Sequence, residues 1–432
     1  MPSPYSNNAN NANGLRAREL SWALYDVGTS AYATTVMAAF FPVFLKQYWA
    51  SGVPAIESTF WLGVVNSGSA LTALLLSPVL GSVSDAGGLK KPLLFVSALL
   101  GIAMAAGLYF IGHGDYGTAL LFYGLGMVGF SVGMVFYDSL LPSVTLPHRF
   151  ERVSAFAVGM GYLGGVSLFG LSVLMTQQPA WFGLADATAA VKLSFLLVAG
   201  WWLLFTLPLL FFVHEPPTRR ATGFAALRAG LSQLGATFHH IRQLKVVMLF
   251  LGAYWLYVDG VDTIVQMAVD YALAIGFDAG GLMLALLVTQ FVGVPATLVF
   301  GRLGERFGAK PTILVGLAVY ALVVVWGAAM REPWEFYGIA VMVGLVQGGV
   351  QAMSRALFAR IIPKDKAGEF FGFMNLLSKF AAVLGPIMVG VVSRATGEPR
   401  LSMLSLLILF GAGAALLLRV DVREGEARAA EL

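Results

Sequence analysis

Cysteine is absent from the 432 residues of this chain. Its absence excludes disulfide bonds, thiol catalysis and thiolate metal sites. Charged residues are also scarce, because Asp, Glu, Lys and Arg together make up 12% of the chain, against roughly 25% in soluble domains. Hydrophobic residues reach 58%. This balance indicates an integral membrane protein.

Other signals are missing as well. The polar, Asn-rich residues 1–14 lack the apolar core and cleavage site of a signal peptide. No nucleotide-binding loop is present, and the predicted helices hold neither a paired nucleophile and base nor a metal cluster. We therefore expect no enzyme, no cofactor and no metal. The net charge of +4 is spread along the chain, so nucleic acid is not an expected partner.

Long apolar stretches dominate what remains. A membrane-spanning helix needs roughly 20 apolar residues, and about twelve such stretches occur. They are 21–45, 60–83, 92–112, 118–141, 153–176, 192–213, 245–271, 280–301, 311–330, 335–359, 368–393 and 401–419.

Basic residues fall mainly on one side of these stretches. Of the 27 Lys and Arg residues, 20 lie in the N-terminal tail, the even-to-odd loops and the C-terminus. Positive charge marks the cytoplasmic side, so both termini should be cytoplasmic in a multi-pass protein of the cell membrane. High Ala, Gly and Arg content suggests the inner membrane of a bacterium.

The connections divide the predicted helices into two sets of six. We expect a disordered cytoplasmic tail over 1–20, a six-helix half over 21–213 and a second half over 245–420, followed by a cytoplasmic tail over 421–432. The linker 214–244 carries apolar residues at helical spacing, which favours an interfacial amphipathic helix. An ordinary solvated loop is the alternative.

The two halves contain matching sequence motifs. Tyr25-Asp26 with Gly28 in the first predicted helix corresponds to Tyr257-Val258-Asp259-Gly260 in the seventh. The turn Gly81-Ser-Val-Ser-Asp85 through Lys91 has a counterpart in Gly301-Arg-Leu-Gly-Glu305-Arg306 through Lys310. These repeats indicate a duplicated six-helix unit with a pseudo-twofold axis. The glycines beside the Tyr and Asp residues suggest places where a helix can open its backbone toward a substrate.

The glycine-acid-base turns resemble the signature of the major facilitator superfamily. Finer stretches are similar to the branch that contains the fungal autophagy-related vacuolar amino-acid effluxers and many bacterial permeases. They are Trp22-Ala-Leu-Tyr-Asp26, Tyr137-Asp-Ser-Leu-Leu-Pro142, Gly161-Tyr-Leu-Gly-Gly165, Asp259-Gly260, Gln347 through Arg355, and Glu369-Phe-Phe-Gly372. The resemblance implies an all-α facilitator fold of twelve helices, with helices 1, 4, 7 and 10 facing a central cavity and amino acids as substrates of some relatives.

Charges inside predicted helices are the candidate site. A charge at mid-bilayer costs about 3 kcal/mol on insertion scales, so it normally faces protein or a wet cavity. Polar side chains continue from these charges at helical spacing. The candidates for substrate binding or proton coupling are Asp26, Tyr25, Asp259, Asp262, Gln266, Gln347, Gln351, Arg355 and Lys379.

Their positions suggest separate roles. Asp259 and Asp262 lie one turn apart, and two neighbouring carboxylates at low dielectric resist being ionised together, which suits proton coupling. Arg355 could clamp a carboxylate. We also expect a cytoplasmic gate, to which Arg355 would contribute as well. Its residues are Asp85, Asp138, Glu305, Arg306 and Arg355. The alternative is a structural lattice of ion pairs, such as Asp138 with Arg355 and Asp259 with Lys379.

These features together predict a secondary transporter. We expect a monomer in the lipid bilayer that moves a small polar solute, most simply an amino acid, by alternating access and with proton coupling. A nutrient receptor or scaffold with the same fold is the alternative. That alternative predicts binding without flux.

Overall fold

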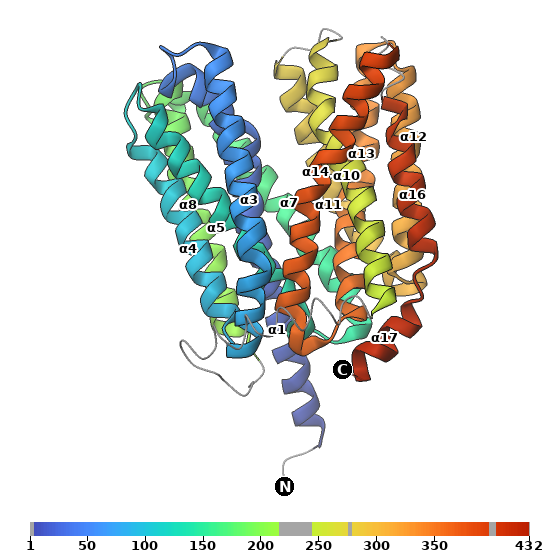
Figure 1. Cartoon of the computed structure of the whole chain (residues 1–432). Helices are drawn as coiled ribbons and strands as arrows, with labels where there is room; N and C mark the ends of the chain where they lie inside the picture. The colour runs from blue at the N-terminus through green and yellow to red at the C-terminus, as the bar shows by residue number, and fades with distance from the viewer. Residues whose placement is uncertain (1–3, 216–243, 275–278, 397–402, 432) are drawn as a thin grey trace. The chain divides into compact units, whose positions relative to one another are not determined.

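The computed structural model describes residues 4–215, 244–274, 279–396 and 403–431, and these form helices joined by short turns. Figure 1 shows the chain as a set of long helices. The first half contains α1 (Pro4–Ala31), η1 (Tyr32–Phe40), α2 (Phe41–Phe44), η2 (Leu45–Trp49), α3 (Ala55–Gly87), α4 (Lys90–Gly107), α5 (Tyr116–Ser139), α6 (Leu141–Val144), α7 (Phe150–Gln177) and α8 (Ala187–Phe212). The second contains α10 (Lys245–Ala274), α11 (Ala279–Phe307), α12 (Ala309–Ala329), α13 (Pro333–Ile361), α14 (Ala367–Thr396), α16 (Leu406–Leu418) and α17 (Val422–Glu431).

Each predicted apolar stretch corresponds to one helix or one run of helices. Within the described residues, 10 helices are long and apolar enough to cross a membrane, and α16 is a shorter apolar helix. The all-helical membrane architecture predicted from the sequence is therefore found in the described residues.

Capping side chains set several helix starts. The Asp115 carboxylate accepts the Thr118 amide at 3.2 Å before α5, and Asp186 accepts the Ala189 amide at 2.7 Å before α8. Glu332 and Glu335 form a reciprocal capping box at the start of α13. These bonds satisfy amides that a helix N-terminus leaves without intrahelical partners.

The chain divides into two compact units. The first comprises 1–145 and 160–230, and the second comprises 146–159 and 231–432. The division departs from a simple six-plus-six arrangement, because the first turns of α7 belong with the second unit. There, Gly301 lies so close to Ala155 that an added Cβ would approach the Ala155 methyl to 2.6 Å.

The two glycines in the matched Tyr-Asp stretches support helix packing. A Cβ on Gly28 would lie 3.0 Å from the Trp202 Cα of α8, and one on Gly260 would lie 2.8 Å from the Phe410 ring of α16. Both α1 and α10 continue as helices through these positions. The glycines thus permit α1 to approach α8 and α10 to approach α16, and the expected opening of the backbone is not observed.

Helix α1 changes its hydrogen-bond pattern after Ala31. The next nine residues form π-helix, and the Phe41 amide donates to the Val36 carbonyl five residues earlier. A second π segment ends with the Ala50 amide donating to Leu45 at 2.7 Å. π-Helical turns inside α-helices occur frequently at functional sites. This π segment directly follows the part of α1 that carries Asp26 and Ser30.

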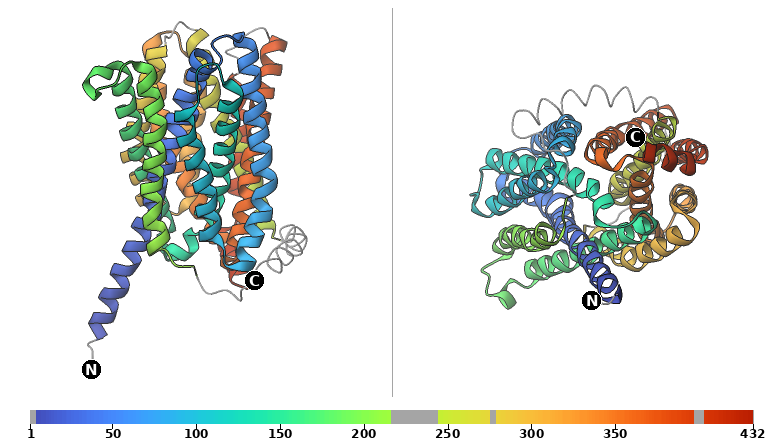
Figure 2. Two further views of the ribbon diagram at one scale, coloured as in Figure 1. Left: turned by 90° about the vertical axis from the view of Figure 1, so that its left-hand side faces the viewer. Right: turned by 90° about the horizontal axis from the view of Figure 1, so that it is seen from below.

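Both ends of the chain differ from the expected tails. Residues 4–20, expected to be disordered, form the first turns of α1, which project past the neighbouring helices of the first unit (Figure 2). Extending an existing helix adds one bond per residue fixed, so it costs far less than starting a helix. The C-terminal residues form α17, whose Gly425 is buried. The predicted linker helix falls within 216–243, outside the described residues.

Candidate functional site

The first polar group lies on α1 and is covered by α7. Asp26 has 7% of its surface exposed. The Thr29 hydroxyl donates to the Tyr25 carbonyl at 3.2 Å and lies 3.5 Å from Asp26 Oδ1. A Cβ on Gly161 would lie 2.6 Å from the Ser30 hydroxyl and 3.3 Å from Asp26 Cγ. The small residue on α7 therefore allows α7 to cover this carboxylate closely.

Two Tyr-Asp pairs from α1 and α5 meet in the first unit. The Tyr25 and Tyr137 rings lie 5.0 Å apart, and Trp22 stacks on Tyr137 at 4.5 Å. The Trp22 indole nitrogen also donates to the Tyr137 carbonyl at 2.9 Å. Trp22 is thus a core residue. The Tyr25 hydroxyl is within electrostatic reach of Asp26 and Asp138, so the sequence-predicted residues of these two helices are neighbours.

The second polar group centres on Asp259 of α10, which is fully buried. Both of its carboxylate oxygens lie 3.0 Å from the Gly385 amide of α14. Thr263, one turn further along α10, donates its hydroxyl to the Asp259 carbonyl at 2.7 Å. The sequence analysis did not anticipate Gly385, because side-chain patterns do not reveal a backbone donor on another helix.

The other candidate residues of the second unit differ in how far their side chains are buried. Asp262 and Gln347 are half-buried, and Gln351 is exposed. The side chains of Gln266 and Lys379 lie outside the described residues, so a pair between Asp259 and Lys379 stays a prediction. Trp255, the other tryptophan next to a Tyr-Asp stretch, is also half-buried.

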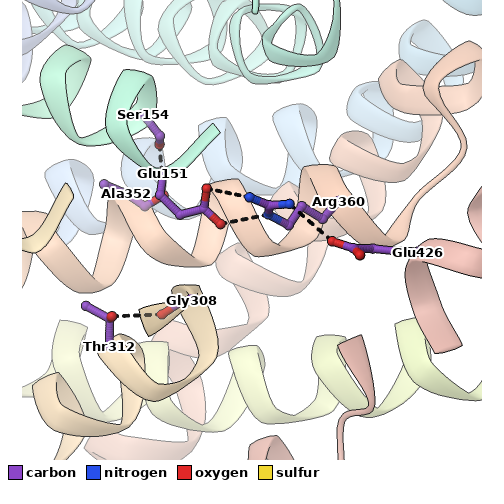
Figure 3. Close-up of polar contacts among 7 residues, drawn as sticks. All are labelled: Glu151, Ser154, Gly308, Thr312, Ala352, Arg360 and Glu426. Atoms are coloured by element: carbon purple, nitrogen blue, oxygen red, sulfur yellow. Dashed lines mark hydrogen bonds and ion pairs between the residues drawn. The ribbon is translucent and has the colours of Figure 1, made fainter. Parts of the chain in front are cut away.

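Arg355 is buried and hydrogen-bonded to the first turns of α7. Its Nε donates to the Ser154 hydroxyl at 2.9 Å, and a terminal nitrogen donates to the Ser154 carbonyl at 3.2 Å. The Ser154 hydroxyl donates in turn to the Ala352 carbonyl at 2.8 Å (Figure 3). Arg355 thus joins α13 to the part of α7 that belongs to the second unit.

A second arginine of α13 strengthens the same junction. The Arg360 guanidinium donates one hydrogen bond of 2.7 Å to each carboxylate oxygen of Glu151. It also contacts Glu426 of α17 at 3.2 Å (Figure 3). This cluster was not predicted from the sequence. No spacing pattern relates residues 151, 360 and 426, so only the folded chain reveals it.

The two glycine-acid-base turns are not equivalent. Asp85 is buried and forms a 2.8 Å ion pair with Lys90. Glu305 and Arg306, in the second copy, are both exposed. The predicted gate acids therefore lie in different surroundings, one inside the first unit and one at the surface of the second.

A matched pair of lysines follows these turns. Lys91 donates from Nζ to the Leu210 and Val213 carbonyls at 2.7 and 2.5 Å, at the end of α8. Lys310 donates to the Leu418 and Val420 carbonyls, both at 2.8 Å, at the end of α16. A cation at a helix C-terminus offsets the partial negative charge there. The shared Lys-Pro dipeptide after each turn was the available sequence signal.

Among the described residues, an acid joins this arrangement in the first unit. Glu215 accepts the Lys90 amide at 2.8 Å and the Lys91 amide at 3.3 Å, at the start of α4. Asp421, shortly after α16, instead accepts the amides of Arg423 and Glu424 and begins α17. Within the described residues, no three His, Asp or Glu side chains are grouped to hold a metal ion.

Comparison with known proteins is consistent across sequence and structure. The family model described as "Vacuole effluxer Atg22 like" matches residues 57–150 and 148–430. An uncharacterized MFS-type transporter, YxiO of Bacillus subtilis, is 39% identical over 405 residues, covering 93% of this chain and 94% of its own. Autophagy-related protein 22 of Eremothecium gossypii is 26% identical and covers 95% and 92% of the two chains.

Solved structures share the fold at low identity. The proton:xylose symporter XylE superposes with a TM-score of 0.72 at 14% identity, covering 95% of this chain and 97% of its own. The human organic anion transporter MFSD10 gives a TM-score of 0.71, also at 14% identity, with 93% and 99% covered. At such identity the likeness concerns the fold alone.

Proposed function

The chain is a multi-pass membrane transporter of the Atg22-like vacuole effluxer family within the major facilitator superfamily, and from that premise we propose that it moves an amino acid by proton-coupled alternating access. The term effluxer in the family description supports transport of a solute across a membrane. Its solute and coupling ion are our inference from the residues inside the helices.

Asp259 is the observation that carries the proposal. Its carboxylate is fully buried within an apolar bundle, and its described contacts are the backbone amides of Gly385 and Leu384 and the side chain of Thr263. An ionisable group in the middle of a membrane helix is costly to keep and commonly marks a substrate or proton pathway. We therefore assign the coupled proton to Asp259, with Asp262 as the second acid one turn away.

The surroundings of Asp259 favour a proton over a metal cation. Both of its oxygens face the Gly385 N–H group, and a donor hydrogen directed at a carboxylate occupies the region where a sodium ion would bind. Hard cations also take about six or more oxygen ligands in proteins. A proton needs only one lone pair of the carboxylate.

The first unit supplies groups suited to an ammonium ion. Asp26 and Asp138 lie near Tyr25, and α3 and α5 carry no Lys or Arg. Helices of the second unit carry Arg355 and Lys379 along with their acids. The acids of the first unit would suit the amine of a zwitterion.

Alternating access requires groups that open and close in turn. We assign this role to Asp85, Asp138, Glu305, Arg306 and Arg355, as expected from their positions in the sequence. The basic residues in the predicted cytoplasmic loops support cytoplasmic termini. The composition supports the inner membrane of a bacterium as the location.

A label-exchange screen in proteoliposomes tests this function. Purified protein is supplied with each of the twenty labelled amino acids, with and without an inward proton gradient. We expect at least one to exchange, and to accumulate only when the gradient is present. Saturable binding without flux for every amino acid would favour a receptor, and the absence of both would refute the assignment.

A further inference from the structure

The contact between Asp259 and Gly385 has an unusual form. An amide inside an α-helix ordinarily donates to the carbonyl four residues earlier. Here a carboxylate from another helix lies with both oxygens 3.0 Å from the Gly385 nitrogen in α14. A buried main-chain N–H directed at a carboxylate is the kind of donor that proteins use to bind anions.

Residue 385 has to be glycine for this contact to form. A Cβ at this position would overlap the Thr263 hydroxyl and would lie 3.0 Å from Asp259 Oδ1. The next residue, Pro386, has no amide hydrogen and disturbs the helical bond to residue 382. The absence of a side chain at Gly385 therefore lets the Asp259 carboxylate reach the backbone of α14, which continues as a helix through this position.

We propose that the Gly385 amide is a subsite for the carboxylate of the transported solute, and that Asp259 occupies it as an internal ligand when the solute is absent. The proposal rests on the function proposed above. It adds a chemical requirement, since the solute must carry a free carboxylate.

The exchange of the two carboxylates explains how proton and solute would be coupled. One negative charge occupies the subsite in either state, because two adjacent carboxylates at low dielectric resist being ionised together. Asp259 therefore takes up one proton from water as it leaves the amide, and the solute carboxylate replaces it. No other bond is made or broken, and one proton accompanies each solute.

The described helices that pack on α10 differ in the ionisable groups they carry. Helix α16, which packs on α10, has no ionisable residue, and the Tyr257 hydroxyl is bonded to Ser354 at 2.6 Å. The charged groups described on the helices that pack here include Asp262 on α10 and Arg355 on α13, and the Arg355 guanidinium is hydrogen-bonded to Ser154.

Chemical rescue tests the subsite without knowledge of the solute. The thermal unfolding midpoint of the Asp259→Ala protein is measured in detergent with sodium formate or acetate, and with sodium chloride at the same ionic strength. We expect a saturable rise with the small carboxylates that is absent from the wild type. Asp262→Ala is the matched control and should show no rise. Equal behaviour of all three proteins would overturn the proposal.

A second variant covers the case in which Asp259→Ala does not fold. Asp259→Asn keeps the size of the side chain and removes its charge. Binding of the amino acid found in the exchange screen should tighten about tenfold per unit fall in pH for the wild type, as one linked proton requires. Asp259→Asn should bind with little pH dependence. An unchanged pH slope in Asp259→Asn would refute the exchange.

Analogues separate this inference from the broader function. The corresponding decarboxylated amine and amino-acid amide should compete at least 100-fold more weakly than the parent amino acid. If labelled amino acid exchanges but these analogues compete equally well, the transporter assignment stands and the carboxylate subsite is wrong. If no amino acid is transported while formate still stabilises Asp259→Ala, the subsite stands and the solute assignment is wrong.

Discussion

Removing Arg360 should destabilise the second unit strongly, because its guanidinium pairs with the buried carboxylate of Glu151. The Glu151 side chain is only 2% exposed, and two 2.7 Å bonds to Arg360 hold it. Arg360→Met would leave that carboxylate buried without a cation, which costs about 3 kcal/mol of unfolding free energy. Glu151→Gln should cost about 1 kcal/mol, since Arg360 is 20% exposed and still contacts Glu426.

The assay is equilibrium unfolding in detergent micelles followed by tryptophan fluorescence. A double-mutant cycle with Arg360→Met and Glu151→Gln isolates the interaction between the two residues. The pair Glu424 and Arg428 provides the control, because it spans one turn of α17 at 2.9 Å with side chains 47% and 51% exposed. Such exposed pairs contribute about 0.5 kcal/mol or less. A coupling energy for Glu151 and Arg360 no larger than the control would refute the reasoning.

Further substitutions test other contacts. Lys91→Met and Lys310→Met each remove two hydrogen bonds from a helix C-terminus. Each should lower the unfolding free energy by about 1–3 kcal/mol. A loss of unfolding free energy no larger than that of the exposed Lys364→Met would contradict this. Asp85→Asn should lower the melting temperature more than Glu305→Gln, since only Asp85 is buried in an ion pair. Gly28→Ala should reduce the yield of folded protein, whereas Gly200→Ala, with no atom within 4 Å of its added Cβ, should not.

The helices were predictable because each depends on local composition. A run of apolar residues long enough to cross a bilayer is visible in the sequence without knowledge of its neighbours. The start of α1 was not predicted, because the Asn-rich segment resembles a disordered tail and becomes helical by extending a helix that already exists.

The candidate site was predictable in part. The charges of Asp26, Asp138, Asp259 and Arg355 were identified because charged residues are rare inside apolar stretches. Their partners were not identified, since Gly385 contributes a backbone amide and Ser154 belongs to a turn of α7 far from Arg355 in sequence. Contacts of this type depend on helix packing, which the order of residues along one helix does not reveal.

The most direct test of proton-coupled transport through Asp259 records proton movement and labelled amino-acid flux together in proteoliposomes. For the wild type we predict that internal pH changes with solute entry in a fixed ratio of one proton to one solute. For Asp259→Asn we predict exchange of solute without a pH change and without accumulation against a gradient. Proton movement that continues unchanged in Asp259→Asn would contradict the account.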